Sequence, residues 1–571
     1  MMAFMLLVSV TASAYDVEID GIFYNLSGGR AIVTYDTYGH SSYSGDIVIP
    51  SSVTYNGREY IVNEIHSFAF ELSELTSIVI PNTVTSIGEY AFQGCSNLTS
   101  FNIPEQVTEI SKWCFGDCIS LDSIVIPEGV TEIGSCAFHG CSNLTSISFP
   151  ESITKVGGLA FDETPWFDNQ PDGLVYIGKV AYKYHGYIPN NCEIVIREGT
   201  VCISGECFWE WSTTGLTSVT IPSSVRSIGF GAFYNCGRLT SINLPEGLKE
   251  IENTAFASCS SLTSVVIPAS VTSFGARAFE WCYALGSISV EPGNTVYDSR
   301  NNCNAIIRTS DNVLLEGCHT TVIPEGIKSI GRSALSSTNL LEAPMPISLK
   351  TIDEYAFQSC TKLTSLELPD SLTSIASYAF RYCSGLTTVS IGSSVRWIGT
   401  EAFAQNPNMT DVYCYATQMP SASTSAFKNS KVNENTVLHV PYELLEQYRT
   451  TAPWSEFKEI VPLALPKCAA PTITLLPNGK VSVHSATEGA TCVTNITACN
   501  EEPITDSEIS LSKSLVLYTV TSYATAEGYE DSDVVTATFR LDGLVSDGDI
   551  NGDGIMDVDD VITLISRILA K

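Results

Sequence analysis

The stretch LTSIVIPNTVTSIGEYAFQGCSN, residues 75–97, decides the fold of this chain because the sequence repeats it. Residues 98–120 read LTSFNIPEQVTEISKWCFGDCIS and residues 121–143 read LDSIVIPEGVTEIGSCAFHGCSN, so the period is 23 residues. A fixed period of roughly 20 to 50 residues is typical of solenoids and other repeat architectures. The leucine that opens each unit recurs along the chain, at Leu75, Leu98, Leu121, Leu144, Leu216, Leu239, Leu262, Leu285, Leu340, Leu363 and Leu386, with Met409 in the next register.

The apolar residues of one unit have a spacing that suits neither a long helix nor a single strand. In the first unit they are Leu75, Ile78, Ile80, Val84, Ile87, Ala91, Phe92 and Cys95. We expect a short strand over SIVIP that ends at Pro81, then a second extended piece and a turn. One unit cannot bury its own apolar face, whereas a stack of about thirteen units, with strands about 4.8 Å apart, forms a continuous core.

The repeated motif LTSIVIPxxVTSIGxxAFxGCSN resembles the BspA-like leucine-rich repeat of bacterial surface and secreted proteins. The resemblance runs from about Tyr15 to Leu463, and residues 437–461, VLHVPYELLEQYRTTAPWSEFKEIV, are similar to the closing cap of such arrays. It implies a right-handed solenoid over residues 15–463 with a cap at each end. It also implies a bacterial protein that is secreted or at the cell surface and, in some members, adhesion to host proteins.

The first 14 residues, MMAFMLLVSVTASA, have features of a secretory signal peptide. An apolar run from Phe4 to Val10 precedes the small-x-small triplet that ends at Ala14, while the usual basic residues before the run are missing. We therefore expect a signal peptide over residues 1–14 that is truncated at its N-terminus. No other run approaches the roughly 20 apolar residues of a membrane span. The net charge of -33 argues against nucleic acid or an anionic membrane as the main partner.

Eight of the 19 cysteines share one phase of the repeat: Cys95, Cys118, Cys141, Cys236, Cys259, Cys282, Cys360 and Cys383. Neighbours in this ladder would lie about 4.8 Å apart, but parallel side chains need strained geometry to form disulfides. We therefore expect buried thiols that behave as small apolar groups. The chain has no C-x-x-C pair and only seven scattered histidines, which gives little support for a zinc or redox site.

The strands of the array predict one candidate binding surface. If Ile78 and Ile80 face the core, alternation along the strand places Ser218 and Ser241 of later units on a flat outer face rich in hydroxyl groups. Such a face suits recognition of a protein or a glycan. Serine and threonine also simply suit an exposed strand, and the sequence leaves both interpretations open.

The aromatic insertion after residue 163 is a second candidate surface. The segment TPWFDNQPDGLVYIGKVAYKYHGYIPNN, residues 164–191, and the following CFWEW contain Trp166, Trp209 and Trp211. Indole rings anchor protein interfaces and stack on sugars. A hairpin that only covers the flank of the solenoid explains these rings equally well.

From Cys468 to Leu541 the 23-residue period is absent. Short alternating runs with turn residues between them predict a small all-β sandwich over residues 464–541. This segment resembles the fibronectin-III-like modules related to chitobiase C-terminal domains, which often act as spacers. Cys492 and Cys499 are candidates for a disulfide, which the sequence does not decide.

The last residues, 542–571, have the spacing of a calcium loop followed by an apolar helical stripe. The loop positions for oxygen ligands hold Asp549, Asn551, Asp553, Asp557 and Asp560, together with the carbonyl of Ile555. Loop and helix resemble one half of a type I dockerin, which implies bound Ca²⁺ and a cohesin-like partner contacted through Val558 and Asp559. A dockerin normally carries two such repeats and this chain has one. The alternative is an acidic solvated turn before an amphipathic end.

The sequence contains no nucleophile elbow, phosphate loop or H-E-x-x-H motif. We therefore expect no enzyme, but a secreted or cell-surface binding or adhesion protein whose solenoid recognises a protein or a glycan and whose tail docks in a calcium-dependent way. The alternative is a scaffold component of an extracellular polysaccharide-handling complex, assembled through the tail. The expected fold class is mainly β: a leucine-rich-repeat solenoid of 23-residue units, a small β-sandwich and a short calcium loop-helix tail.

Overall fold

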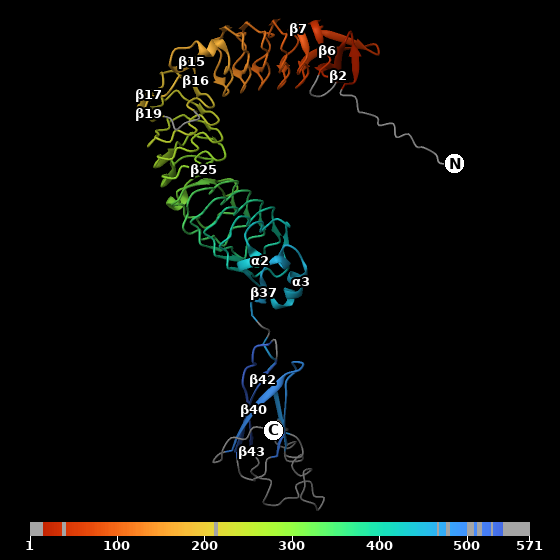
Figure 1. Ribbon diagram of the computed structural model, residues 1–571, viewed down its shortest axis with the longest axis vertical. Helices are drawn as coiled ribbons and strands as arrows, with labels where there is room; N and C mark the ends of the chain where they lie inside the picture. Colours follow the sequence, from red (N-terminus) through yellow and green to blue (C-terminus); the bar gives the residue numbers. More distant parts are fainter. Residues whose placement is uncertain are drawn as a thin grey trace, which may run out of the picture. The chain divides into compact units, whose positions relative to one another are not determined.

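The computed structural model describes residues 15–36, 41–209, 215–464, 467–475, 480–498, 508–510, 517–526 and 529–540. The chain divides into two compact units, one of residues 1–438 and 451–459 and the other of residues 439–450 and 460–571. The first unit is a β-solenoid of about 17 turns with repeats of about 23 residues (Figure 1). The predicted solenoid is confirmed. The expected number of about thirteen turns was too low, because turns at the N-terminal end and beside the insertions lack the leading leucine.

Most turns contribute two short strands to two parallel ladders along the solenoid, and each ladder is divided into several sheets. The turns that begin at Leu239 and Leu340 contribute only the second strand. Residues one repeat apart pair with each other, as Ser123 does with Ser146 in the first ladder and Ile110 with Ile133 in the second. The second extended piece expected from the sequence therefore forms a ladder of its own. The alternation along the first strand also holds, because Ile78 is 1% exposed and Val79 is 51% exposed.

The first ladder consists of β4 (Ser44–Val48), β7 (Glu74–Val79), β9 (Ser100–Phe101), β11 (Ser123–Val125), β13 (Ser146–Ser148), β17 (Cys192–Val195), β19 (Leu216–Thr220), β22 (Ser264–Ile267), β24 (Ser287–Val290), β30 (Ser365–Glu367), β32 (Thr388–Ile391) and β34 (Asp411–Cys414). The second consists of β8 (Ser86–Ile87), β10 (Glu109–Ile110), β12 (Glu132–Ile133), β14 (Lys155–Val156), β18 (Cys202–Ile203), β20 (Ser227–Ile228), β21 (Glu250–Ile251), β23 (Ser273–Phe274), β28 (Ser329–Ile330), β29 (Thr351–Ile352), β31 (Ser374–Ile375), β33 (Trp397–Ile398) and β35 (Ser421–Ala422).

An N-terminal sheet starts the stack, with the strand order β1-β2-β3-β6-β5. Its strands are β1 (Val17–Ile19), β2 (Ile22–Ser27), β3 (Arg30–Thr34), β5 (Ser52–Tyr55) and β6 (Arg58–Ile65), and β8 continues from β6. At the other end lie α2 (Val432–Asn435) and η3 (Trp454–Glu456). Trp454 is 1% exposed and its indole N–H donates to the carbonyl of Pro420 at 3.1 Å, so this segment covers the last turn as a cap.

One buried phenylalanine per turn forms a stack of rings inside the solenoid. Neighbouring ring centroids lie 5.0 to 5.6 Å apart. The stack has three parts: Phe70, Phe92, Phe115, Phe138 and Phe161; Phe208, Phe233, Phe256 and Phe279; and Phe357, Phe380, Phe403 and Phe427. It breaks at the two insertions.

The cysteine ladder lies buried beside this stack, and all eight thiols are free, as expected. Each thiol donates to a main-chain carbonyl of the preceding turn, as Cys118 does to Phe92 at 3.2 Å. At the same register Asn406 donates to the carbonyl of Phe380 at 2.9 Å. The register therefore selects a small side chain that can donate a hydrogen bond, which explains its regular use of cysteine.

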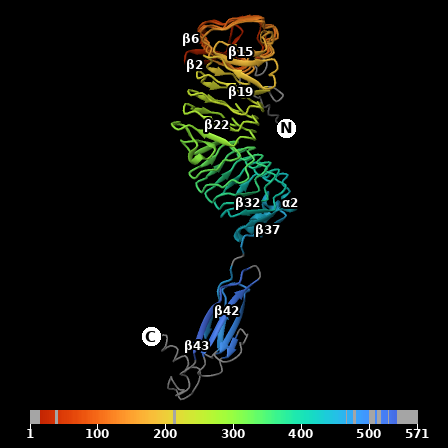
Figure 2. The same cartoon turned by 90° about the vertical axis from the view of Figure 1, so that its left-hand side faces the viewer.

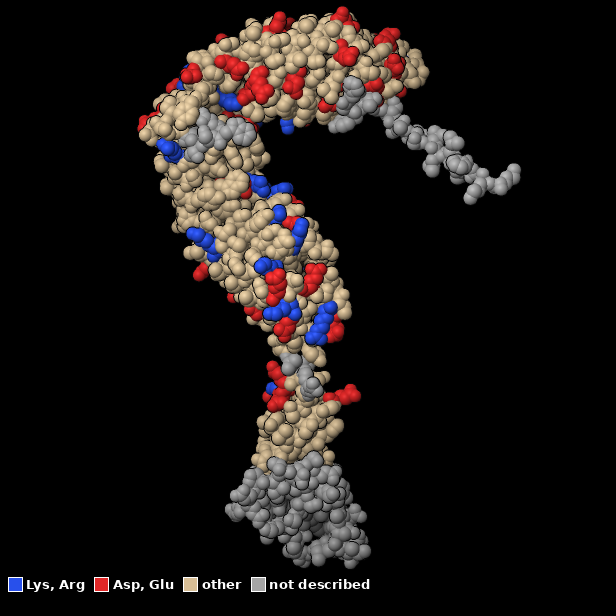
Figure 3. Space-filling view, in the orientation of Figure 1, with Lys and Arg blue, Asp and Glu red and all other residues tan. Residues whose placement is uncertain are grey.

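The first insertion, α1 (Pro165–Asp168), β15 (Gly173–Ile177) and β16 (Val180–His185), lies where the stacking axis changes direction. Figure 2 shows the first turns nearly end-on and the later turns from the side. Across the inside of this bend, the Lys155 ammonium lies 2.7 Å from a carboxylate oxygen of Glu252 and 3.4 Å from one of Glu250. Figure 3 shows mainly acidic side chains before the bend and a mixture of both signs beyond it.

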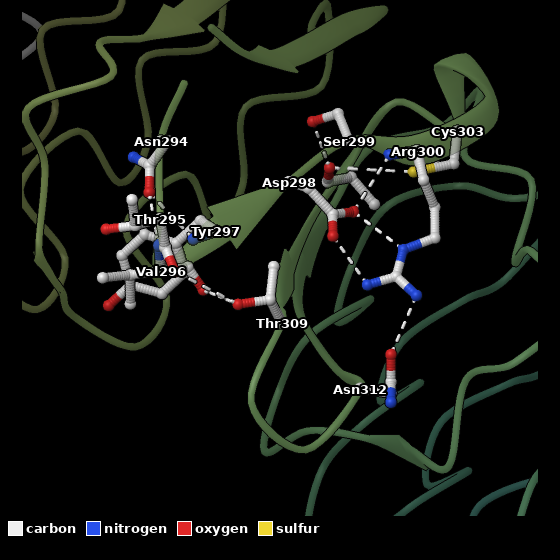
Figure 4. Close-up of polar contacts among 11 residues, drawn as sticks. Asn294, Thr295, Val296, Tyr297, Asp298, Ser299, Arg300, Cys303, Thr309 and Asn312 are labelled. Atoms are coloured by element: carbon white, nitrogen blue, oxygen red, sulfur yellow. Dashed lines mark hydrogen bonds and ion pairs between the residues drawn. The ribbon is translucent and has the colours of Figure 1, made fainter. Parts of the chain in front are cut away.

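The second insertion contains β25 (Tyr297–Asp298), η1 (Arg300–Asn302), β26 (Ala305–Arg308) and β27 (Val313–Gly317). Its loop is fixed by a polar network (Figure 4). The Arg300 guanidinium donates to both carboxylate oxygens of Asp298, at 2.9 and 2.6 Å, and to the amide oxygen of Asn312 at 2.8 Å. Asn294 also donates to the carbonyl of Val271 at 2.9 Å, so the network joins the insertion to the preceding turn and serves the fold.

The second unit begins with β36 (Val437–Val440), shared at its start with the first unit, then η2 (Tyr442–Leu444), α3 (Leu445–Thr450) and β37 (Glu459–Pro462). Two antiparallel sheets follow, in the orders β38-β39-β41 and β40-β42-β43. Their strands are β38 (Thr472–Leu475), β39 (Lys480–His484), β40 (Thr491–Ala498), β41 (Glu508–Ser510), β42 (Leu517–Thr525) and β43 (Val535–Arg540). Cys499 lies outside the described residues, so the possible disulfide with Cys492 stays untested. Over the described ranges, no helix has the length and hydrophobicity to cross a membrane.

Candidate functional site

A pocket of about 300 Å³ opens in the four regular turns between the two insertions. It lies at the turn that holds the buried phenylalanine of each repeat. We call it the aromatic pocket, and its lining consists of Glu206, Trp209, Phe230, Gly231, Tyr234, Thr254, Arg277, Glu280 and Trp281.

Two successive turns of the aromatic pocket carry small residues at a position where some other turns carry a ring. Glu206, Gly231, Thr254 and Arg277 occupy this position in successive turns, with φ of 56°, 56°, 54° and 59°. The same left-handed position carries a large ring in five other turns, at Phe68, Tyr90, Trp113, Tyr355 and Tyr378, and no ring at Cys136, Leu159, Ser333 and Glu401. Gly231 and Thr254 leave a hollow at this position. A Cβ built on Gly231 would lie 3.6 Å from Tyr234 and 3.8 Å from both Glu206 and Thr254.

Three rings of the pocket take no part in a ring stack. Elsewhere, rings at the left-handed position stack on a neighbouring turn, as Tyr355 does on Tyr378 at 4.8 Å. Within the described residues, Phe230, Tyr234 and Trp281 make no ring-to-ring contact. Phe230 is 49% exposed, and Tyr234 and Trp281 are half-buried. All three rings line the pocket, so a ligand in it can contact them.

One wall of the pocket holds a buried charged pair. Glu280 is 6% exposed, and its carboxylate lies 3.8 Å from Nε of Arg277. Ser336 donates to the other carboxylate oxygen at 3.2 Å, while Arg277 Nε donates to Ser333 at 2.9 Å. Burial raises the pKa of Glu280, and Arg277 and Ser336 oppose this shift. Both serines come from beyond the second insertion, so the turn after that insertion supports this wall.

The opposite wall holds Glu206. Its Oε2 is buried and has no hydrogen-bond partner in the part of the chain that the structure describes. Burial raises the pKa of Glu206, while the nearby ammonium of Lys183 lowers it and Asp162 raises it further. Lys183 forms an ion pair with Asp162, which also accepts from the hydroxyl of Tyr182 at 3.0 Å. The hairpin β15-β16 thus places a cation near Glu206, and that cation is itself held by Asp162.

A second hollow, of about 230 Å³, lies on the inside of the bend. Its walls are the main chain of several glycines and the side chains of Glu109, Glu132, Lys155 and Glu252. The Lys155 ammonium already pairs with Glu252 there. Phe230 is its only ring, so this hollow lacks the stacking surface of the aromatic pocket.

The structure brings one of the sequence-predicted binding residues, Trp209, into the aromatic pocket. Trp166 is partly buried and packs edge-on against Phe149 and Phe161, each at a ring-centroid distance of 5.2 Å. Trp166 therefore covers the core of the first turns. Trp211 lies outside the described residues.

The outer face of the first ladder carries the two predicted serines. Ser218 is half-buried and Ser241 is exposed. The predicted orientation of this face therefore holds. The aromatic pocket lies at a different part of each turn, so these serines do not line it.

The predicted calcium ligands Asp549, Asn551, Asp553, Ile555, Asp557 and Asp560, and the predicted partner contacts Val558 and Asp559, lie outside the described residues. The calcium site therefore stays a prediction from the sequence. Among the residues that the structure describes, no group of three or more histidine, cysteine or acidic side chains is placed to hold a metal ion.

Phe230, Tyr234, Glu280 and Trp281 line the pocket and were not predicted from the sequence. A signal for them exists, since Gly231 and Thr254 are small residues at the left-handed position of successive turns. To use this signal, one must know that the left-handed positions of successive turns lie along one edge of the solenoid. The sequence repeat alone does not give this orientation.

A family model described as a BspA type leucine rich repeat region matches the chain in six copies, over residues 63–188, 201–307 and 317–440. Similar solved structures include a leucine-rich repeat protein from Bacteroides ovatus ATCC 8483, with 27% identity over 72% of this chain and 99% of that chain and a TM-score of 0.27. A leucine rich cell surface protein from Faecalibacterium prausnitzii A2-165 has 23% identity over 74% of this chain and 94% of that chain, with a TM-score of 0.33. The pneumococcal vaccine antigen PcpA has 16% identity over 79% of this chain and 99% of that chain, with a TM-score of 0.31. No curated protein matches the sequence.

Proposed function

Because the chain belongs to the BspA type leucine-rich repeat family, we propose that it is a secreted or cell-surface binding protein whose solenoid recognises a protein or a glycan. Members of this family are typically non-catalytic binding proteins. The aromatic pocket is the observation that carries the proposal. It combines uncovered rings with buried polar groups, and its volume of about 300 Å³ is at the lower end of ligand sites.

The binding test uses the full chain on an array of immobilised extracellular-matrix proteins and glycans. The pocket variant replaces Tyr234 and Trp281 by alanine. The control replaces Tyr187, a 62% exposed ring outside the pocket, by alanine. We expect the pocket variant to lose at least about tenfold in affinity, because truncation of a ring that anchors a ligand costs about 2 kcal/mol or more. The control should keep the wild-type affinity. Equal binding by all three proteins would place the ligand elsewhere.

The tail is part of the same proposal. It binds Ca²⁺ through the side chains of Asp549, Asn551, Asp553, Asp557 and Asp560 and the carbonyl of Ile555, and presents Val558 and Asp559 to a cohesin-like partner. The ligand spacing of residues 549–560 supports this role. Calcium would neutralise the carboxylates of the loop and order it.

A scaffold in an extracellular polysaccharide-handling complex is the second candidate function, and the dockerin-like tail favours it. Under this function the tail makes the productive contact and the solenoid acts as a spacer. Loss of partner capture in the Asp549→Ala chain, with unchanged capture in the pocket variant, would favour the scaffold. The reverse pattern would favour the binding solenoid.

A further inference from the structure

We propose that the aromatic pocket binds an uncharged saccharide unit, which stacks on the uncovered rings and gives its hydroxyl hydrogens to Glu206 and Glu280. This inference rests on the proposed function and specifies the ligand of the same site. It follows from three properties of the pocket: its ring faces, its buried acceptors and its balance of charge.

The rings provide a stacking surface inside a hollow. One face of a pyranose presents C–H groups, which pack on an aromatic face and gain from its burial. Phe230, Tyr234 and Trp281 have faces that no other described ring covers. In contrast, Tyr90 stacks on Phe68 at 5.0 Å and has its face occupied. The turns from residue 206 to residue 281 combine such rings with a hollow in front of them.

The buried acceptors match hydroxyl groups. The Oε2 atom of Glu206 is buried without a partner among the described residues, so the carboxylate has unused capacity to accept. Glu206 lines the pocket, so a sugar hydroxyl can donate to its carboxylate while the hydroxyl accepts from another group. Arg277 has guanidinium N–H groups beyond the Nε that bonds Ser333, and these can donate to a second hydroxyl.

The charges of the pocket favour an uncharged ligand. Arg277 lies 3.8 Å from the Glu280 carboxylate, and the ammonium of Lys183 lowers the pKa of Glu206, so each carboxylate has a nearby cation. A cationic ligand would face the Arg277 guanidinium, and an anionic ligand would face Glu206 and Glu280. The volume of about 300 Å³ suits one or two sugar rings and is too small for a protein loop.

The repeat itself supplies a variant that fills the pocket without a change of fold. Thr254 has φ of 54°, and tyrosine is already accommodated at this position of other turns, with φ of 59° at Tyr90 and 61° at Tyr355. Thr254→Tyr should therefore place a ring in the hollow on an unchanged backbone. Leu159→Tyr is the matched control, since Leu159 has φ of 57° at the same position of a turn outside the pocket.

The experiment titrates the full chain, in calcium and in chelator, with maltotetraose, cellotetraose, xylotetraose and N-acetyllactosamine, followed by tryptophan fluorescence and saturation-transfer NMR. We expect at least one of these probes to bind in both conditions. Thr254→Tyr should weaken this binding by at least about tenfold and Glu206→Gln by about tenfold, the equivalent of one lost hydrogen bond to a charged group. Leu159→Tyr should bind as wild type, and the unfolding midpoints of the two tyrosine variants should agree.

Three results separate the saccharide inference from the proposed function. If Thr254→Tyr abolishes capture of a glycoprotein, and wild type still captures that glycoprotein after enzymatic removal of its glycans, the pocket is a binding site but the saccharide is wrong. If wild type binds none of the four probes and no member of a glycan array, the saccharide inference is also wrong. If Thr254→Tyr binds every glycan and protein ligand as wild type does, the pocket is not the site and both proposals fail.

Discussion

Glu316 is a buried carboxyl group whose replacement should stabilise the protein at neutral pH. It lies in β27, is 3% exposed, and its Oε2 has no hydrogen-bond partner within the described ranges. Burial raises its pKa well above the usual value, and nearby Cys282 and Glu280 add to the shift. Main-chain N–H groups of Phe279 and Ala278 oppose it. Glu316→Gln keeps the shape of the side chain and removes the ionisation.

The sign of the effect follows from the direction of this shift. In the unfolded chain the pKa of a glutamate is about 4.3, so the native state of Glu316 keeps a proton that the unfolded state releases above this pH. Stability is therefore greatest below about pH 4.3 and falls as pH rises toward the folded pKa. The loss is at most about 1.4 kcal/mol per pH unit across that window. Glutamine does not ionise, so the variant does not lose stability in this way. At pH 8 its free energy of unfolding should exceed that of wild type by about 1–3 kcal/mol.

The assay is urea denaturation of the full chain at pH 5, 6, 7 and 8, followed by circular dichroism. The control is Glu325→Gln, which removes an exposed carboxylate from the same region. The unfolding midpoint of Glu316→Gln should rise relative to wild type as pH increases, while that of the control should stay parallel to wild type. A midpoint difference between Glu316→Gln and wild type that is the same at every pH would refute the reasoning.

Two further predictions concern the core and the tail. Phe233→Ala and Phe256→Ala should each cost about 3–5 kcal/mol in the free energy of unfolding, because both rings are fully buried. Their centroids lie 5.1 Å apart, so a double-mutant cycle should give a coupling of about 0.5–1.5 kcal/mol, and a coupling of zero would show that the stack adds nothing to burial. Calorimetric titration of Ca²⁺ should give a dissociation constant of about 10⁻⁵ to 10⁻³ M that is lost in Asp549→Ala and Asp560→Ala, whereas equal uptake by all three chains would contradict a calcium loop.

The solenoid could be predicted from the sequence because a repeat fixes its own contacts. Residues 23 apart must lie side by side once the turns stack, which is why Ile110 pairs with Ile133 and why alternation correctly placed Ile78 inside and Val79 outside. The same argument predicted buried thiols at Cys118 and its equivalents. The prediction was correct for residues that have equivalent neighbours in every turn.

The aromatic pocket could not be predicted in this way because it depends on departures from the repeat. Trp166 and Trp209 come from the same stretch of aromatic sequence, yet Trp166 packs on Phe161 while Trp209 lines the pocket. Their difference is set by where the hairpin β15-β16 folds over the flank. That geometry depends on contacts between residues at irregular separations, such as Phe161 and Tyr182, whose rings lie 5.8 Å apart. No period in the sequence encodes these contacts.

A binding site in such an array needs both a hollow and groups that differ from turn to turn. Gly231 and Thr254 create the hollow inside the repeat, at the position where five other turns carry a ring. The polar groups of its walls have neighbours outside the four turns, because the ammonium of Lys183 in the first insertion lowers the pKa of Glu206 and Ser336, beyond the second insertion, donates to Glu280. The two insertions therefore do more than interrupt the solenoid. They bring polar groups to the walls at both ends of the four turns, so that a ligand meets a defined pattern of acceptors rather than one more copy of the repeat.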